Sequence, residues 1–169
     1  MQIPLEVIGL SKIYNNKDAV KDISFRVNKN EIIGILGPNG CGKTTTIGMI
    51  LGLLKPSNGK VLINGIEIEK KRVDLLNHLN FISPYIELPK KLTVKQNLEV
   101  YGRLYDVKNL KKKIEMLSEK LRLSQIINKL AGELSSGQKN RVSLAKSIIN
   151  NPTVLLLDEP TASLDPETG

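Results

Sequence analysis

Residues 37–44 read GPNGCGKT and match the spacing G-x-x-x-x-G-K-[ST]. Glycines at these positions let successive backbone N–H groups turn toward one anion. In such loops the lysine, here Lys43, reaches the terminal phosphates of a nucleotide, and the hydroxyl, here of Thr44, binds Mg²⁺. The pattern therefore predicts a nucleotide phosphate site, with contacts from Gly37, Pro38, Asn39, Gly40, Cys41, Gly42, Lys43, Thr44 and Thr45.

Two adjacent acids, Asp158 and Glu159, follow the apolar run Thr153–Leu157. In proteins with a phosphate loop, an aspartate at the end of an apolar strand holds the Mg²⁺ shell. Glu159 comes one residue later, at the carboxyl edge where ligands of open α/β sheets bind. It can accept a proton from an attacking water. Alone, the acids would also suit a surface turn, but beside a phosphate loop they predict a metal ligand and a general base.

A second candidate anion site lies at residues 134–138, which read LSSGQ. The segment is small and polar and stands at the start of a predicted helix, where free N–H groups point outward. The chain has no second phosphate loop to supply another nucleotide. One nucleotide and two anion sites in each chain suggest that two chains share each nucleotide.

Strands are predicted through the first third of the chain. Ile23, Phe25 and Val27 alternate with polar residues, which indicates a half-exposed antiparallel strand. The continuous apolar run Ile32–Leu36 is typical of a strand buried on both faces, as in a parallel sheet. Gly59–Ile68 is a further β stretch with a turn at Gly65. These segments place the phosphate loop directly after a predicted strand.

Helices are predicted after the phosphate loop and through the middle of the chain. A first stripe of Ile47, Ile50, Leu51 and Leu54 is ended by Pro56. Thr93 is expected to cap a helix that runs to Tyr105. Asn109 is expected to cap a second helix, with Leu110, Ile114, Leu117 and Leu121 on one face. A third helix is predicted from near Ser136 to before Asn151, with Val142, Ala145 and Ile149 on one side. Alternating strands and helices predict an α/β fold with a mostly parallel sheet and a helical insertion at about residues 90–133.

Composition narrows the class of protein. The 169 residues carry a net charge of +8 and one cysteine, so no intrachain disulfide is possible and a reducing compartment is expected. No signal peptide is recognisable, and no apolar run approaches the ~20 residues that span a bilayer. The basic run at residues 108–113 has no interleaved aromatics. It is therefore interpreted as a solvated helix start, and no nucleic acid is expected.

Four motifs in order, GPNGCGKTT, LSSGQ, LLLDEP and SLD, make the chain resemble the ATP-binding cassette (ABC) ATPase family over essentially its whole length. Ser136 replaces the first glycine of the family's LSGGQ signature. A GTPase is disfavoured, because no N-K-x-D segment follows the phosphate loop. The resemblance implies one nucleotide-binding domain over residues 1–169. Its fold would be that of a P-loop NTPase with a mostly parallel central sheet, an N-terminal antiparallel β subdomain and an inserted helical subdomain.

The resemblance also implies a head-to-tail dimer that binds ATP and Mg²⁺. ATP would lie between the phosphate loop of one chain and the signature of the other, formed by Ser135, Ser136, Gly137 and Gln138. Ser163 and Asp165 match the D-loop, which crosses that interface. Tyr14 stands where the family places an aromatic that stacks on adenine, although a plain strand-edge tyrosine is the alternative. Glu159 and Lys43 would be catalytic, and Thr44 and Asp158 would hold the metal.

The sequence departs from the family pattern at two places. Pro84 stands where the family has a glutamine that contacts Mg²⁺ and senses the transport subunit, and Tyr85 or a water would have to replace that contact. The single histidine, His78, precedes the signature and cannot be the family's switch histidine. The sequence thus resembles a cassette truncated at the C-terminus before its last core strand. A fragment of this kind is expected to bind nucleotide better than it hydrolyses it.

The expected function is the ATP-binding and hydrolysing subunit of a transporter. It would couple hydrolysis to transport through a separate transmembrane permease, and would be cytoplasmic and peripheral on the inner face of the cell membrane. A soluble ABC-type protein that acts on ribosomes is one alternative. A nucleotide-binding remnant without turnover is another.

Overall fold

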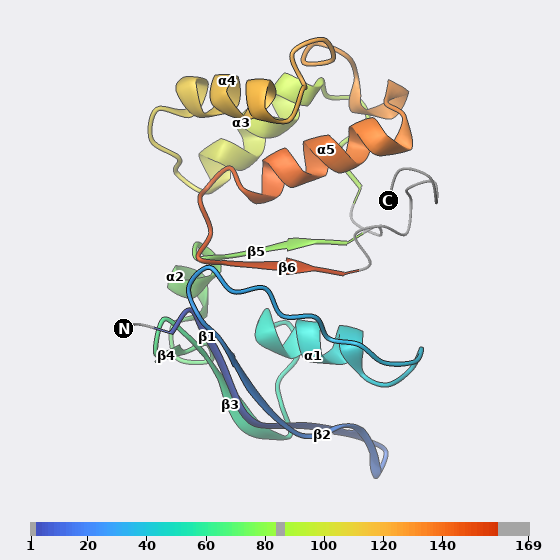
Figure 1. The fold of residues 1–169 in the computed structure, drawn as a ribbon, viewed down its shortest axis with the longest axis vertical. Coiled ribbons are helices and arrows are strands. Elements are labelled where there is room, and N and C mark those ends of the chain that lie inside the picture. Colours follow the sequence, from blue (N-terminus) through green and yellow to red (C-terminus); the bar gives the residue numbers. More distant parts are fainter. Residues whose placement is uncertain (1–2, 84–86, 159–169) are drawn as a thin grey trace. The chain divides into compact units, whose positions relative to one another are not determined.

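The computed structural model describes residues 3–83 and 87–158. The chain divides into two compact units, Met1–Leu79 and Asn80–Gly169. A four-stranded sheet belongs to the first unit, and a two-stranded sheet to the second (Figure 1). Several residues singled out above lie outside the described residues, namely Pro84, Tyr85, Glu159, Ser163 and Asp165.

The sheet of the first unit is built from two tight hairpins. Strands β1 (Leu5–Tyr14) and β2 (Lys17–Val27) pair antiparallel, β3 (Asn58–Ile63) pairs with the other edge of β1, and β4 (Ile66–Glu67) follows β3. Both turns place two residues at positive φ, Asn15-Asn16 at 48° and 60° and Asn64-Gly65 at 51° and 78°. Such turns match the twist of paired strands. The predicted antiparallel strand and the turn at Gly65 are confirmed.

Helix α1 (Lys43–Ile50) follows the phosphate loop and buries Thr46, Ile47, Met49 and Ile50. It ends before the expected stop at Pro56, because Gly52 adopts a left-handed φ of 64°. The N–H of Leu53 then donates to the carbonyl of Gly48 at 2.9 Å, which closes the last turn. A short helix α2 (Arg72–Leu76) was not predicted.

The predicted buried strand at Ile32–Leu36 is wrong for this structure. Residues 31–38 are irregular, and Ile32 and Leu36 are 98% and 93% exposed. Within the described part of the chain, no backbone hydrogen bond involves residues 32–36. An apolar run becomes a buried strand only where neighbouring strands satisfy its N–H and C=O groups. The four-stranded sheet leaves this segment unpaired.

The second unit contains β5 (Leu79–Ile82), which begins at the unit boundary, and β6 (Val154–Leu157). The two strands form one sheet and run in the same direction (Figure 1). The predicted strand before the acid pair is confirmed. Within it only Val154 is buried, and Leu157 is 47% exposed. The carboxyl end of β6 therefore opens toward solvent within this unit.

Helices α3 (Val94–Leu104), α4 (Leu110–Lys120) and α5 (Ser136–Ser147) form the rest of the second unit, with a short 3-10 turn η1 at Ala131–Glu133. Thr93 caps α3, as predicted, and the structure adds a reciprocal capping box with Gln96. Asn109 precedes α4, but it lies at φ 53° and its side chain makes no capping hydrogen bond. The three apolar faces meet in one core that includes Leu98, Ile114, Leu117, Val142, Ala145 and Ile149.

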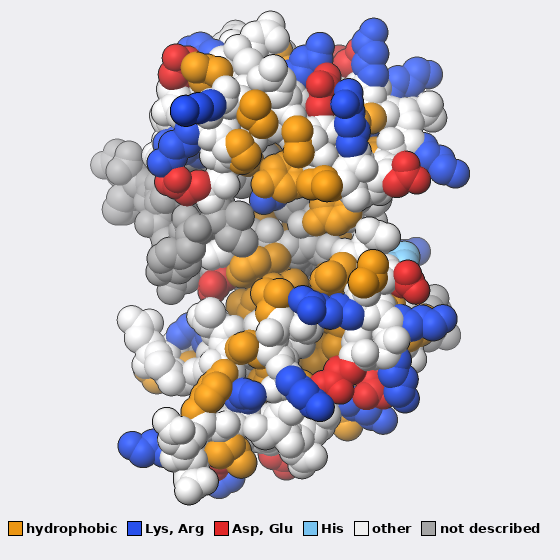
Figure 2. Space-filling view, turned by 180° about the vertical axis from the view of Figure 1, so that it is seen from behind, with side chains coloured by type: hydrophobic (Ala, Val, Ile, Leu, Met, Phe, Trp, Pro, Cys, Tyr) orange, Lys and Arg blue, Asp and Glu red, His pale blue; other side chains and the backbone are white. Residues whose placement is uncertain are grey.

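Charged side chains of both signs lie among polar and hydrophobic ones on the face that Figure 2 shows. On the face shown in Figure 2, lysine and arginine side chains are spread over both units, with aspartate and glutamate between them. No helix in residues 3–83 and 87–158 combines the length and the apolar character needed to cross a bilayer.

Candidate functional site

The phosphate loop lies at the N-terminus of α1, as its sequence predicts. Gly40 and Gly42 adopt left-handed φ values of 81° and 93°. Gly42 is the N-cap residue of α1 and brings no capping side chain, so the first N–H groups of the helix have no side-chain partner there. A helix N-terminus in this state is a favourable place for an anion.

Lys43 folds back over its own loop. Its Nζ donates to the carbonyl oxygens of Gly37 at 2.7 Å and Pro38 at 2.9 Å. These two bonds hold the ammonium group against the backbone of the loop. Thr44 is exposed in the first turn of α1, while Thr45 is half-buried. The Sγ of the exposed Cys41 lies beside Gly37, 2.5 Å from where a Cβ on that glycine would stand.

Position 42 requires glycine for two reasons, its positive φ and the close approach of strand β2. A Cβ built on Gly42 would lie 2.3 Å from the backbone oxygen of Ala19 and 2.9 Å from Cγ2 of Val20, both in β2. Gly40 has the same handedness, but a Cβ there would meet nothing within 4 Å. Strand β2 therefore sets the position of the helix start, a role for Ala19 and Val20 that no motif in the sequence indicates.

This difference gives a matched pair of variants. We expect Gly40→Ala to cost about 1–2 kcal/mol of unfolding free energy, because alanine is strained at positive φ. Gly42→Ala should cost more and should weaken nucleotide binding, because β2 or the loop must move to admit the methyl group. Thermal unfolding and nucleotide titration of the two variants would measure this. Equal losses of stability would show that the contact with Ala19 is unimportant.

Tyr14 is the last residue of β1 and is 46% exposed. The Lys12 ammonium group lies 5.0 Å from the centroid of its ring, a cation–π contact. The same ammonium group donates to the carbonyl of Lys55 at 2.8 Å, which keeps it beside the ring. Tyr14 is thus an accessible aromatic side chain at the end of a strand, next to a fixed cation.

The signature residues form the start of α5. Ser135 is the N-cap, and its hydroxyl accepts from the N–H of Gln138 at 3.3 Å. In return, Oε1 of Gln138 accepts from the N–H of Ser135 at 3.0 Å. Leu134, just before the cap, is buried. Ser136 is exposed, and a Cβ on Gly137 would meet nothing within 4 Å. The helix start is therefore capped by two reciprocal hydrogen bonds and has open space beside Gly137.

Asp158 directly follows β6, and its N–H donates to the carbonyl of Ile82 at 2.9 Å. This bond fixes the backbone of Asp158 at the carboxyl edge of the sheet, where Ser83 follows β5. The carboxylate is half-exposed. The hydroxyl of Thr44 and the carboxylate of Asp158 are hard oxygen donors, the kind that Mg²⁺ prefers. Among the described residues, no group of three His, Cys, Asp or Glu forms a metal cluster.

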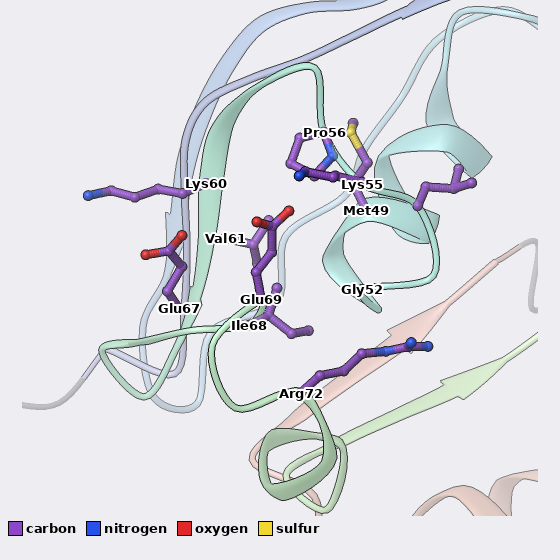
Figure 3. Close-up of a pocket in the computed structure, with 11 residues that line it drawn as sticks. Met49, Gly52, Lys55, Pro56, Lys60, Val61, Glu67, Ile68, Glu69 and Arg72 are labelled. Carbon is purple, nitrogen blue, oxygen red and sulfur yellow. The ribbon is translucent and has the colours of Figure 1, made fainter.

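A separate pocket of about 250 Å³ lies at the other end of α1 (Figure 3). Met49, Val61 and Ile68 are buried in its floor. Charged residues surround the floor, with Lys60 and Glu67 on the β3–β4 hairpin and Arg72 near Gly52 (Figure 3). None of its lining residues belongs to the phosphate loop. The predicted nucleotide contacts are thus on an open loop, not in this pocket.

The predicted site residues divide between the two units. Tyr14 and the phosphate loop belong to Met1–Leu79, whereas the signature and Asp158 belong to Asn80–Gly169. Each group stands at the end of a regular element. The phosphate loop precedes α1, the signature begins α5, and Asp158 follows β6.

Comparison with known proteins agrees with the motifs. The chain is 40% identical to the Nod factor export ATP-binding protein I of Rhizobium johnstonii over 167 residues, which is 97% of this chain and 53% of that protein. It is 36% identical to the ABC transporter ATP-binding protein NatA of Bacillus subtilis, over 87% of this chain and 61% of that protein. The chain therefore spans about half the length of the Rhizobium relative.

Solved structures show the same fold. The ATP-binding subunit of an ABC transporter superposes with a TM-score of 0.86 at 28% identity, covering 96% of this chain and 68% of that one. A nucleotide-free ATP-binding cassette gives a TM-score of 0.82 at 29% identity, covering 99% and 72%. The P-loop NTPase fold implied by the motifs is thereby confirmed. The family model described as ABC transporter matches residues 20–162, and the chain belongs to this family.

Proposed function

We propose that the chain is the ATP-binding and hydrolysing subunit of an ABC transporter. The main support for this proposal is a pair of helix N-termini, one in each unit. Each has backbone N–H groups that an anion can reach. One is the phosphate loop before α1, and the other is the signature Ser135–Gln138 that begins α5. Two such sites and a single phosphate loop fit a nucleotide shared between two chains.

In this proposal, two copies or two related chains bind head to tail. The phosphate loop of one chain binds the β- and γ-phosphates through Lys43 and the backbone of residues 37–44. Residues Ser135, Ser136, Gly137 and Gln138 of the other chain contact the γ-phosphate, and Ser163 and Asp165 lie at the interface. Tyr14 stacks on the adenine ring. The two helix ends contact the same nucleotide from opposite sides. Hydrolysis cleaves the γ-phosphate that joins them, and the dimer then opens.

The chemistry is attack of water on the γ-phosphorus with release of ADP and phosphate. Glu159 accepts the proton of that water, and Lys43 stabilises the charge that develops on the phosphate oxygens. Thr44 and Asp158 would hold Mg²⁺, which would neutralise charge on the phosphates. Their hydroxyl and carboxylate oxygens suit that ion.

A transmembrane permease is the proposed second partner, with this chain peripheral on the cytoplasmic face of the cell membrane. The names of the relatives support a transporter, including the Nod factor export protein of Rhizobium and a probable multidrug ABC transporter ATP-binding protein of Escherichia coli. Glu87 and Lys90, which form an ion pair at 2.8 Å, would belong to the surface that meets the permease. The hydrogen bond and the charge of Lys90 lower the pKa of Glu87 from its usual value.

The deciding experiment is equilibrium binding of a fluorescent ATP analogue to the purified chain, with and without Mg²⁺ and with GTP as competitor. We expect Mg²⁺-dependent binding of the adenine nucleotide. No affinity for adenine nucleotides with Mg²⁺ would end the proposal. Phosphate release then separates an ATPase from a nucleotide-binding remnant, and co-purification with a membrane subunit separates a transporter subunit from a ribosome-acting protein.

A further inference from the structure

The signature helix α5 is tied to the carboxyl end of α4 by one arginine. Nη1 of Arg141 donates to the carbonyl oxygen of Arg122 at 3.2 Å and contacts that of Leu121 at 3.5 Å. Both carbonyls lie just past α4, where backbone acceptors have no partner within the helix. A cation is favourable at this end of a helix. Arg141 follows Leu121 by 20 residues in the chain.

Arg141 lies one turn after the signature. It follows Gln138 by three positions, and residues three apart share a helix face. The neighbouring Val142 is fully buried in the core, as are Ala145 and Ile149. These apolar contacts hold one face of α5 against the core. The guanidinium adds a directional bond near the signature, which limits small rotations of the first turns of α5.

The carboxyl end of α4 is itself a firm anchor. Arg122 adopts a left-handed φ of 53°, and the N–H of Leu123 donates back to the carbonyl of Ser118 at 2.8 Å. Leu123 is completely buried. This is the closed helix end of a Schellman type. The core therefore fixes the position of this helix end. The hydrogen bond from Arg141 restrains α5 relative to it.

We infer that Arg141 is a positioning residue for the reaction proposed above, on which this inference rests. It orients the signature N-terminus toward a nucleotide bound by the partner chain and touches neither nucleotide nor metal. Its loss should turn α5 slightly and misdirect the backbone N–H groups of Ser136 and Gly137. Displacements of about 1 Å in such groups can cost about 100-fold in rate. Nucleotide affinity, set mainly by the phosphate loop in the other unit, should barely change.

The test compares Arg141→Met and Arg141→Lys with the control Arg103→Met. Arg103 is exposed in the last turn of α3, and its side chain has no partner within the described residues. We expect Arg141→Met to lower kcat about tenfold with the Kd for MgATP unchanged, and Arg141→Lys to recover part of the loss, because lysine keeps the charge but not the fork of donors. The control should match wild type in both quantities.

The ATPase rate of a mixture of two variants is a second measurement. A loss of stability alone would not raise this rate. Chains with Arg141→Met keep an intact phosphate loop, and chains with Lys43→Ala keep an intact signature. Mixed dimers therefore contain one complete site, and the mixture should exceed the sum of the separate rates. An unchanged kcat in Arg141→Met, or a mixture equal to that sum, would overturn the inference and leave the proposed function standing. Absence of MgATP binding by the wild type would overturn both.

Discussion

Replacing Lys43 by alanine should lower the affinity for MgATP by about 100-fold or more, which corresponds to about 2.7 kcal/mol. Nζ of Lys43 is already held at the loop, 2.7 Å from the carbonyl of Gly37 and 2.9 Å from that of Pro38. Little side-chain freedom is left to lose when phosphates bind there. Hydrogen bonds from a charged donor contribute about 1.5–3 kcal/mol each, and the β- and γ-phosphates offer more than one acceptor.

The variant must be separated from a simple loss of folding, because the two bonds of Lys43 also close the loop. Thermal unfolding measured beside nucleotide titration makes that separation. Lys60→Ala is the matched control, since Lys60 is an exposed lysine in the same unit, on β3, outside the phosphate loop. It should bind MgATP like the wild type. A Lys43→Ala chain that is folded and binds MgATP with wild-type affinity would contradict the role assigned to this lysine.

The parts of the fold that the sequence predicts best are those decided by neighbouring residues. The caps at Thr93 and Ser135 are each completed by a glutamine three residues later, so both helix starts can be located from the sequence. Gly52 also ends α1 through a local conformation, its left-handed φ of 64°. The sequence did not indicate this glycine as the stop, because the proline at position 56 is the stronger helix-ending residue. The turns Asn15-Asn16 and Asn64-Gly65 carry the residues that tolerate positive φ.

Features that depend on distant residues could not be predicted in this way. The apolar run Ile32–Leu36 has the composition of a buried strand, yet composition does not say which strands would pair with it. The contact of Gly42 with the backbone of Ala19 joins segments whose relative position is fixed only by the sheet. Arg141 reads as one more surface cation in a basic helix until the carbonyls of Leu121 and Arg122 are placed beside it.

The second large effect concerns Glu159, for which we expect Glu159→Gln to abolish measurable phosphate release while keeping MgATP bound. The residue follows Asp158, whose N–H is fixed to the carbonyl of Ile82 at 2.9 Å. Glutamine keeps the size and the hydrogen-bonding reach of glutamate but cannot accept a proton from water. A positioned general base contributes about 10²–10⁴-fold to a rate. Because the nucleotide is kept but not cleaved, the variant should also persist longer as a dimer in ATP.

Glu119→Gln makes the same chemical change on an exposed face of α4 and serves as the control. It should release phosphate at the wild-type rate. Single-turnover phosphate release and size-exclusion chromatography in ATP would measure the two consequences in one preparation. Phosphate release by Glu159→Gln at the wild-type rate would show that Glu159 is not the general base. Loss of MgATP binding would instead show that Glu159 contributes to nucleotide binding, which its proposed role as a general base does not predict.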